Sequence, residues 1–368
     1  MSERVLADDE RLDWLRLIRS ENVGPALFDQ LLERFGSAGQ ALAALPELSR
    51  QGGLKRPFRI CGRTQAEAEI AAAHALGARF VGKTEPDYPV PLRHIDSAPP
   101  VICIKGRSEL ARREAVAIVG SRNASANGKR LARMFAFELS GAGYAIVSGL
   151  ARGIDTAAHE AALAHGTVAV IANGIDIAYP PENAGLQDAI GRDGLLISEM
   201  PPGVAPREAS FPRRNRIISG MSRAVIIVEA ALRSGSLITA RLANEQGREV
   251  FAVPGSPFDP RAEGTNRLIR DGAHLLTRSH EVIDALLPLQ ERHMQQASET
   301  PFITAPVTME VDQPARQAIL ALLSPAPTDI DDLIRESGMP AQLVLGVLLE
   351  LELAGKLVRQ GRQLVSLV

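Results

Sequence analysis

Short apolar runs dominate the middle of the chain, and a turn and a helix-length segment separate each run from the next. The run Ala115–Val119 precedes Gly120, a helix is expected over Gly128–Ser140, and a second run follows at 144–148. Runs of this length are typical of strands that a parallel sheet buries on both faces. The alternation predicts an α/β domain with a doubly wound parallel sheet. A second helix is expected at 155–164, and further strands at 167–172, 195–198, 223–229 and 249–253.

The first 80 residues are predicted to form a separate helical module. Apolar residues recur there at spacings of three and four, as at Leu12, Leu15 and Ile18, which is the periodicity of amphipathic helices. The Gly24-Pro25 step opens a segment that resembles half of a helix-hairpin-helix or SAM-like unit, in which helix amides can meet phosphate. The alternative, that this step only starts a helix, stays open.

The C-terminal part is predicted to be a winged helix. Residues 289–314 are rich in Gln, Thr, Pro and Glu and lack periodicity, as expected of a linker. An amphipathic run at 315–324, a helix capped by Thr328 and an apolar helix over Ala341–Leu353 then precede a strand, a turn and a strand. The expected organisation is a helical module at 1–80, a sheet domain at 81–288, a linker at 289–314 and a winged helix at 315–368.

The turns that follow the strands are the candidate site, because ligands of doubly wound sheets bind beyond the carboxyl ends of the strands. Four strand ends carry small turns with a polar or charged residue, and we expect these turns to converge on one rim. Their backbone amides lie at helix starts, where they suit phosphate groups. The turns match no dinucleotide fingerprint and lack the P-loop lysine, so ATP hydrolysis is not expected. The candidate binding residues here are Gly120, Ser121, Arg122, Gly149, Arg152, Gly174, Ser234, Gly235 and Ser236.

The segment Ser210–Gly220, just ahead of the strand at 223–229, carries the strongest local signal. It holds a cluster of cationic and amide side chains, Arg213, Arg214, Asn215 and Arg216. Arginine near a sheet rim suits bidentate contact with phosphate. The alternative is a solvated helix start whose arginines pair with Glu199 and Glu208. Phe211 either stacks on a base, as in single-strand binders, or belongs to the core.

A few residues raise the question of catalysis. His159 lies four residues after Asp155, and an aspartate can orient a histidine as a general base. No nucleophile in a recognisable context accompanies this pair, and such pairs commonly stabilise a helix. Glu199 and Glu229 end predicted strands, and we expect them to hold arginines in place and not to act as catalytic carboxylates. The sequence therefore predicts no catalytic residues.

Composition limits the classes of partner. The 368 residues include 41 Lys plus Arg and 43 Asp plus Glu, for a net charge of -2, so any nucleic acid must be held locally. Cys61 and Cys103 lack metal-ligand spacing, and we expect no metal, disulfide or cofactor. No apolar run approaches the ~20 residues of a membrane span, and the acidic N-terminus lacks the apolar core of a secretion signal. We expect a cytoplasmic protein with no membrane partner.

The turns and the arginine cluster belong to a series of motifs that resembles the DNA-processing protein A family, also called Smf. The motifs match in order and span roughly Pro86–Leu276, and together they are far more specific than any one of them. They read Ile-Val-Gly-Ser-Arg, Ser-Gly-Leu-Ala-Arg-Gly-Ile-Asp-Thr-Ala-Ala-His, Tyr-Pro-Pro-Glu-Asn, Phe-Pro-Arg-Arg-Asn-Arg-Ile-Ile-Ser-Gly, Ser-Gly-Ser-Leu-Ile-Thr-Ala and Phe-Ala-Val-Pro-Gly.

This resemblance implies an extended Rossmann-like domain that binds single-stranded DNA, forms a homodimer and helps load the RecA recombinase during natural transformation. It places DNA contact on Arg122, on the glycine turns and on the stretch 211–216. The terminal modules vary within the family. Here the third helix of the expected winged helix, at 340–355, has two glutamates and no Arg or Lys. Because a groove-reading helix needs hydrogen-bond donors, we expect this helix to dock protein.

Two other classes of function stay open at this point. A nucleotide-cleaving enzyme of related fold, similar to the phosphoribohydrolases, would carry a Pro-Gly-Gly-x-Gly-Thr turn, whereas this chain has Ser-Gly-Ser-Leu-Ile-Thr at the corresponding stretch. An adaptor whose arginines bind an acidic protein surface would show no affinity for oligonucleotides.

Overall fold

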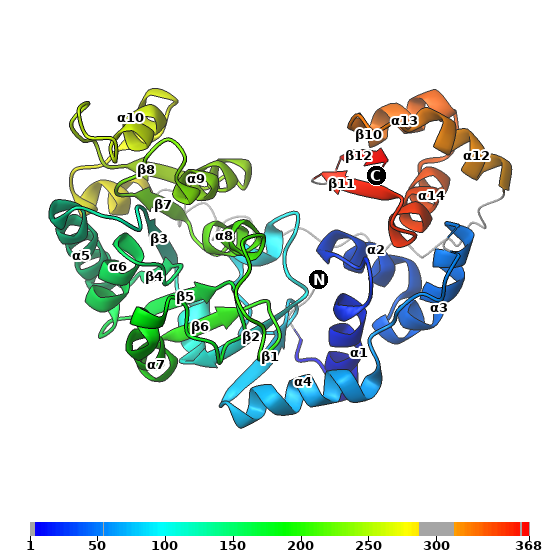
Figure 1. Cartoon of the computed structure of the whole chain (residues 1–368), viewed down its shortest axis with the longest axis horizontal. Helices are drawn as coiled ribbons and strands as arrows, with labels where there is room; N and C mark the ends of the chain where they lie inside the picture. Colours follow the sequence, from blue (N-terminus) through cyan, green and yellow to red (C-terminus); the bar gives the residue numbers. More distant parts are fainter. Residues whose placement is uncertain (1–3, 54, 287–312, 361–362, 368) are drawn as a thin grey trace. The chain divides into compact units, whose positions relative to one another are not determined.

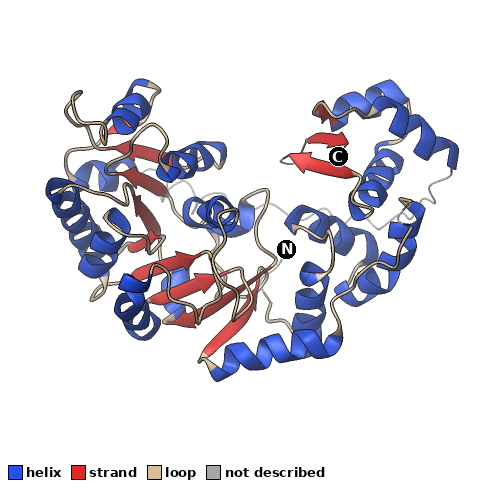
Figure 2. Ribbon diagram, viewed as in Figure 1, coloured by secondary structure: helices blue, strands red, loops and turns tan. Residues whose placement is uncertain are grey.

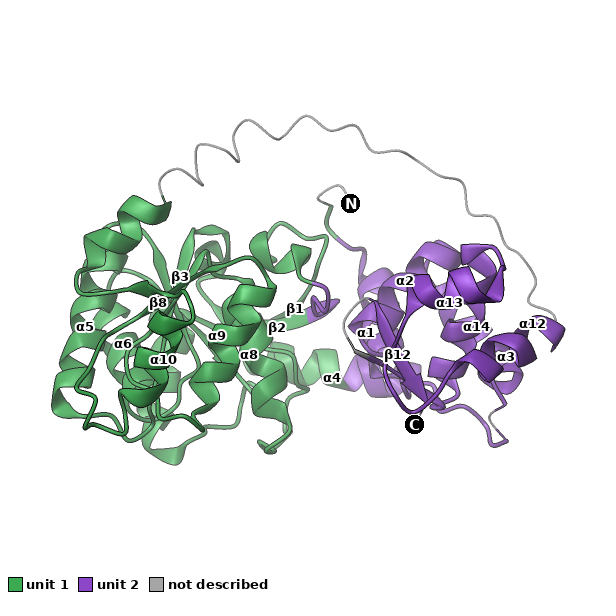
Figure 3. Cartoon of the chain, turned by 90° about the horizontal axis from the view of Figure 1, so that it is seen from above, with its two compact units in different colours: residues 1–5, 69–95, 102–301 green, residues 6–68, 96–101, 302–368 purple. Residues whose placement is uncertain are grey.

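The computed structural model describes residues 4–53, 55–286, 313–360 and 363–367. It divides into two compact units (Figure 3). The larger unit comprises Met1–Val5, Glu69–Ile95 and Ile102–Pro301, and the smaller comprises Leu6–Ala68, Asp96–Val101 and Phe302–Val368. Most of the predicted linker, 289–314, lies outside the described residues.

The larger unit is built on a nine-stranded sheet with the order β1-β2-β6-β5-β4-β3-β7-β8-β9 (Figure 1). From β6 to β9 every neighbouring pair is parallel, which confirms the predicted doubly wound sheet. At the other side β2 runs antiparallel to β6, so the sheet is mixed. The strands are β1 (Ala78–Gly82), β2 (Val101–Gly106), β3 (Ala115–Val119), β4 (Ala145–Ser148), β5 (Thr167–Ile171), β6 (Leu195–Ser198), β7 (Ala224–Ile227), β8 (Glu249–Ala252) and β9 (His274–Leu275).

Helices cover both faces of this sheet (Figure 2), which explains why the central strands are apolar at every position. All residues of β3 to β7 are buried. Val116 and Ile118 of β3 share one core cluster with Phe135 and Leu139 of α5 and with Ile154 of α6. The helices of this unit are α5 (Ala126–Gly141), α6 (Ile154–Ala162), α7 (Ala184–Asp193), α8 (Ser210–Gly220), α9 (Gly235–Glu245) and α10 (Glu263–Arg270), with 3-10 turns η1 (Pro91–His94), η2 (Ser108–Arg112) and η3 (Pro181–Asn183).

The N-terminal helices are α1 (Asp8–Arg19), α2 (Pro25–Phe35), α3 (Ala38–Gln51) and α4 (Arg63–Ala75). Trp14 and Phe28 are fully buried and pack edge to face, with ring centroids 5.1 Å apart. The Gly24-Pro25 step starts α2, with Gly24 as the N-cap and Pro25 in the first turn, where its missing N–H costs nothing. The first strand begins at Ala78, so β1 crosses the boundary expected at residue 80.

The C-terminal residues form the predicted winged helix, with a three-stranded sheet in the order β10-β12-β11. Its apolar core joins Ile319, Leu333, Val347 and Val365. The expected cap by Thr328 is wrong, because Asp329 accepts the hydrogen bond from the Asp331 amide at 2.8 Å. The elements are α12 (Gln313–Leu322), β10 (Thr328–Asp329), α13 (Ile330–Ser337), α14 (Ala341–Leu353), β11 (Leu357–Gln360) and β12 (Leu364–Leu367).

His159 is a core residue and not the general base that its spacing from Asp155 suggested. Its side chain is 0% exposed, and Nδ1 lies 2.7 Å from the Thr167 hydroxyl. That hydroxyl donates its proton to the Ile146 carbonyl, so Nδ1 is the donor to Thr167. The buried Nε2 has no hydrogen-bond partner, so a proton there would be unsatisfied and the neutral ring is favoured. Burial, reinforced by the charge of Arg214, lowers the pKa of His159 to about 3.

The buried neutral His159 makes the protein acid-sensitive in a way that a substitution can isolate. Below pH 6.5 the unfolded chain binds a proton that the folded chain excludes, so this residue lowers stability as the pH falls from 6.5 toward 3. His159→Gln keeps a hydrogen-bonding side chain that does not titrate. Between pH 7 and pH 5 the wild type should lose about 2 kcal/mol of unfolding free energy relative to this variant. Urea unfolding at both pH values measures the difference, and a constant gap between the two proteins would contradict the assignment.

Candidate nucleic-acid interface

Two adjoining hollows open at the rim of the sheet, among the loops that follow β3, β4, β5 and β7. Their volumes are about 380 and 520 Å³. The smaller hollow also reaches Asn173 and Tyr179, and the larger reaches the start of α9. The hollows share Arg122, Asn123, Ala151, Phe211 and Arg214 along their common wall.

Most of the residues predicted to bind a ligand line these hollows. The turns after the strands do converge on one rim, as expected from the doubly wound topology. Gly174, Arg213 and Arg216 line neither hollow; Gly174 packs against the loop at 201–203 instead. The predicted residues that line a hollow are Gly120, Ser121, Arg122, Gly149, Arg152, Phe211, Arg214, Asn215, Ser234, Gly235 and Ser236.

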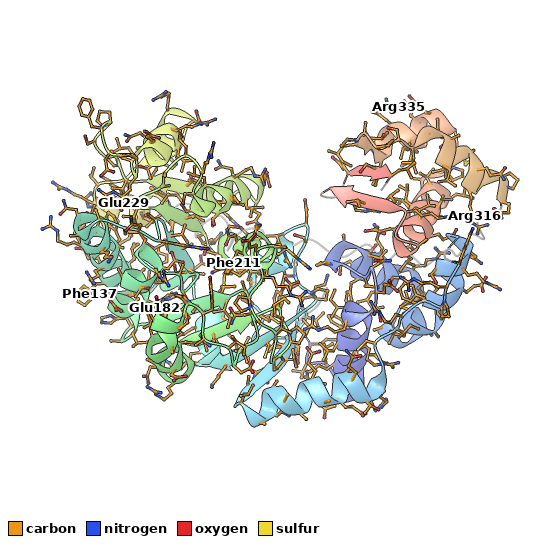
Figure 4. The ribbon with its side chains drawn as sticks, viewed as in Figure 1. Phe137, Glu182, Phe211, Glu229, Arg316 and Arg335 are labelled. Atoms are coloured by element: carbon orange, nitrogen blue, oxygen red, sulfur yellow. The ribbon has the colours of Figure 1, made fainter. Side chains whose placement is uncertain are left out.

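Phe211 forms the wall between the hollows, at the start of α8 (Figure 4). The guanidinium carbon of Arg122 lies 5.3 Å from the centroid of its ring, and the Tyr179 ring lies at 5.7 Å with a tilt of 41°. Phe211 is half-buried and Arg122 is exposed. Phe211 is therefore not a core residue. It is held on a surface by a cation–π contact and an aromatic contact.

Arg214 lies on the floor of both hollows. It is 7% exposed, and its Nη1 donates a hydrogen bond of 2.7 Å to the carbonyl of Val170. A Cβ atom at position 149 would overlap this guanidinium, so the strand end at Gly149 can approach Arg214 only because it lacks a side chain. The Nε atom of Arg214 has no hydrogen-bond partner. Arg214 is thus a fixed positive charge beneath the rim.

Asp155 shapes the loop above this charge. Its carboxylate accepts hydrogen bonds from the amides of Gly149 at 3.1 Å and Ala151 at 3.3 Å. Burial raises the pKa of Asp155, and the nearby Arg214 opposes that shift. Burial lowers the pKa of Arg214 to about 10, against the attraction of Asp155, so Arg214 stays protonated at neutral pH. Together the two residues fix the turn after β4.

The remaining arginines of α8 point in other directions. Arg216 is 8% exposed, and its Nη2 donates to both carboxylate oxygens of Glu199 at 2.6 Å. Arg213 is exposed on the flank of the helix. Successive residues of a helix are turned by about 100°, so Arg214 lies on a different side of α8 from Arg213 and Arg216, which are three residues apart and are neighbours on the helix surface. The predicted pairing of an arginine with Glu199 is confirmed for Arg216. Because Arg216 is buried, however, it does not belong to a solvated helix start, which was the alternative.

Glu229 does not hold an arginine, and that expectation is wrong. Its carboxylate accepts hydrogen bonds from Ser125, from the backbone amide at 2.9 Å and from the hydroxyl at 2.5 Å. Ser125 is the N-cap of α5, so Glu229 secures the start of that helix. A Cβ atom on Gly128 would lie 2.5 Å from the carboxyl carbon, which explains the glycine in the first turn of α5.

Two of the rim arginines differ in their availability to an anion. Arg152 pairs with Glu182 at 2.5 Å, although both side chains are more than half exposed. In the part of the chain that the structure describes, Arg122 has no carboxylate partner. The N-terminus of α9, capped by Ser234, adds its backbone amides to the larger hollow. Arg122, Arg214 and these amides make the rim a surface that favours anions.

Several residues that line the hollows were not predicted from the sequence. Tyr179, Asn123 and Arg233 line them, yet none ends an apolar run. Tyr179 belongs to the Tyr-Pro-Pro-Glu-Asn motif, and that motif was a usable signal for an aromatic residue at the site. Among the described residues no group of His, Cys, Asp and Glu is arranged to hold a metal ion. No described helix is both long and apolar enough to cross a bilayer.

Comparison with known proteins gives three family matches along the chain. Residues 79–287 match the model of DNA recombination-mediator protein A. Residues 8–72 match a DprA-like N-terminal HHH domain, and residues 304–361 match a DprA winged helix domain. Each match lies on one of the modules described above, and the central one covers all of the hollows.

Relatives and solved structures agree with these matches. Protein Smf of Synechocystis sp. is 33% identical over 95% of this chain and 97% of its own, and DNA processing protein DprA of Streptococcus pneumoniae is 48% identical over 53% and 70%. The X-ray structure of the Streptococcus pneumoniae protein has a TM-score of 0.63 at 37% identity, over 76% of this chain and 98% of that one. DNA processing protein A from Helicobacter pylori, whose structure describes a single-stranded DNA binding mode, has a TM-score of 0.52 at 31% identity, over 57% and 96%. With its motifs, fold and matches in agreement, the chain belongs to the DNA-processing protein A family, also named Smf.

Proposed function

We propose that this chain binds single-stranded DNA in the two hollows at the sheet rim. The observation that carries the proposal is the stack of Arg122 on Phe211 above the buried charge of Arg214. A stacking ring beside fixed cations is what a single strand requires, because its bases are free to stack while its phosphates need neutralising. The Helicobacter pylori relative, with its single-stranded DNA binding mode, supports the same ligand.

Because the Phe211 ring is half-buried and oriented, the rim should prefer single strands to duplex. A ring held by Arg122 and Tyr179 keeps its orientation, so little entropy is lost when a base stacks on it. Every base has a face that can stack, so sequence preference should be small. Bases that are paired in a duplex cannot reach such a ring without unpairing, and a duplex should therefore bind more weakly.

The exposed arginines, together with backbone amides of the turns, would contact the phosphates. Within the described residues Arg122 has no competing carboxylate, whereas Arg152 must first leave Glu182. Arg214 contributes its charge from the floor of the hollows, and Arg213 offers a further cation on the flank of α8. The turns contribute mainly small residues that let the strand approach closely, since the amides of Gly149 and Ser236 are already bonded to Asp155 and Ser234. The proposed contact residues of the turns and of α8 are Gly120, Ser121, Gly149, Asn215, Ser234, Gly235 and Ser236. Gly174 and Arg216 support the loops from outside the hollows.

The finer role follows from the family. We infer that the chain forms a homodimer, protects incoming DNA and hands it to the RecA recombinase during natural transformation. This role needs single-strand binding without hydrolysis, and the buried neutral His159 suits a protein that performs no acid–base chemistry at the rim. The absence of catalysis and a cytoplasmic location stay predictions.

Arg122→Ala should weaken binding to oligo-dT and should also reduce its salt dependence. Each lost phosphate contact lowers the slope of log affinity against log salt by about 0.7 on single strands. Arg192→Ala is the matched control, because Arg192 is an exposed arginine in the last turn of α7, which runs from the rim toward the opposite edge of the sheet. Fluorescence anisotropy titrations at several salt concentrations measure both quantities. An unchanged slope for a folded Arg122→Ala protein would contradict a phosphate contact there.

RecA delivery has a separate readout. On single-stranded DNA already coated with a single-strand-binding protein, RecA filaments form after a lag. The chain should shorten this lag at stoichiometric concentration, and Arg122→Ala should not, because DNA capture must precede delivery. ATP hydrolysis by RecA reports filament formation. If the lag is the same with and without the chain while oligo-dT binding is intact, the chain binds DNA but does not load RecA.

A further inference from the structure

The third helix of the winged helix, α14, is the element with which such domains read a major groove. Here it carries two acidic residues, Glu350 and Glu352, and neither Arg nor Lys between Ala341 and Leu353. Both glutamates have a partner within the domain. Arg316 of α12 donates to Glu350 at 2.6 and 3.3 Å, and Arg359 of β11 lies 3.5 Å from Glu352.

These pairs are largely shielded from water. The Glu350 side chain is 2% exposed and that of Glu352 is 16% exposed. Burial raises the pKa of Glu352, and the charge of Arg359 opposes the shift. The acidic residues of α14 are therefore structural and do not present a negative surface to a partner. Most other residues of α14 are apolar, and Val344, Val347 and Leu351 pack in the core of the winged helix itself.

The N-terminal module, in the same compact unit (Figure 3), lies against α14. Gly52 follows α3, and a Cβ atom there would overlap the carbonyl oxygen of Glu350 and would lie 2.8 Å from the Cβ of Ala354. The backbone of Gly52 has φ of -68° and ψ of -1°, which any residue adopts. The glycine is thus needed for the close approach of two backbones and not for its own conformation.

A hydrogen bond also joins the N-terminal module to α14. The Asn22 side-chain amide, in the turn between α1 and α2, donates to the carbonyl of Leu353 at 3.2 Å. Leu353 is the last residue of α14, where helix carbonyls lack partners within the helix. Asn22 therefore caps α14 from another module. Gly355, which follows the helix, has φ of 70°, a conformation that favours glycine, and a Cβ atom there would lie 3.1 Å from the same amide nitrogen.

We propose that the N-terminal helical module is the resident docking partner of the winged helix. It binds the C-terminal end of α14 through Gly52 and Asn22, and this contact covers that end of the helix. While the modules are docked, the end of α14 cannot enter a DNA groove. Any other protein that binds this part of α14 must displace the N-terminal module. The proposal is independent of single-strand binding at the sheet rim.

Gly52→Ala tests the docking in the full-length chain. The added methyl group suits the backbone of an isolated α3, but it would force α3 away from α14. Amide hydrogen exchange near residues 349–354 should then accelerate by about tenfold or more, equivalent to about 1.4 kcal/mol of lost protection. Gly62→Ala is the matched control in the same module, because a Cβ atom there meets nothing within 4 Å. Exchange in α14 that is equal in both variants and in the wild type would overturn the proposal.

A second variant guards against local misfolding. If Gly52→Ala also accelerates exchange in the core of α1, Asn22→Gly distinguishes loss of docking from misfolding of the N-terminal module. Asn22 has φ of 57°, which glycine adopts readily, so this change removes the amide while keeping the turn. Exchange should then rise at the end of α14 and stay unchanged in α1. Unchanged exchange at Leu353 and its neighbours in Asn22→Gly would overturn the docking.

Discussion

The site depends on one buried guanidinium. Arg214 ties α8 to the end of β5 through the Val170 carbonyl and packs under the Gly149 turn that follows β4. Asp155 stands nearby and holds the same turn by its amides. A buried charge without nearby groups of opposite charge or hydrogen-bond acceptors would be costly. The loops of the rim are therefore organised around a cation that the fold has already desolvated, and any anion bound there meets a charge that needs no rearrangement.

The helical geometry of α8 divides its arginines among three tasks. Arg214 turns inward to the floor, Arg216 turns to Glu199 and locks the helix against the end of β6, and Arg213 stays exposed. Phe211, one turn earlier, reaches back over the hollows to Arg122 and Tyr179. A short segment thus supplies a structural ion pair, a fixed charge and a half-buried aromatic ring. The three arginines have different surroundings, which explains why they lie so close together in the sequence although a single phosphate cannot contact all of them.

Much of the fold could be predicted from the sequence, because apolar runs, glycine turns and helix-length segments alternate as is typical of a parallel α/β sheet. The direction of a strand leaves no trace in such runs, so the antiparallel β2 could not be predicted, and β1 and β2 lie ahead of the regular alternation. The strand-end turns were correctly expected to meet. The partners of individual side chains were predicted less well: Glu199 holds an arginine, whereas Glu229 holds Ser125. Such choices depend on three-dimensional distances between residues over a hundred positions apart, as with Ser125 and Glu229.

The same limit applies to the winged helix. The sequence shows that α14 lacks the donors of a DNA-reading helix, but only the structure shows Gly52 and Asn22 against its end. At the rim, the sequence left Phe211 undecided between core and stacking surface, because an isolated phenylalanine beside a polar cluster fits both. The fold places it half-buried, which is the state that lets a ring be oriented by protein and still meet a base.

Base stacking on Phe211 can be tested by measuring the affinity of Phe211→Leu for oligo-dT and for duplex DNA across a range of salt concentrations. Leucine keeps apolar bulk but cannot stack, and stacking contributes about 1–3 kcal/mol per base. Single-strand affinity should fall by roughly 5- to 150-fold, with an unchanged salt slope and an unchanged weak affinity for duplex. Single-strand affinity equal to that of the wild type would show that Phe211 does not hold a base at the rim.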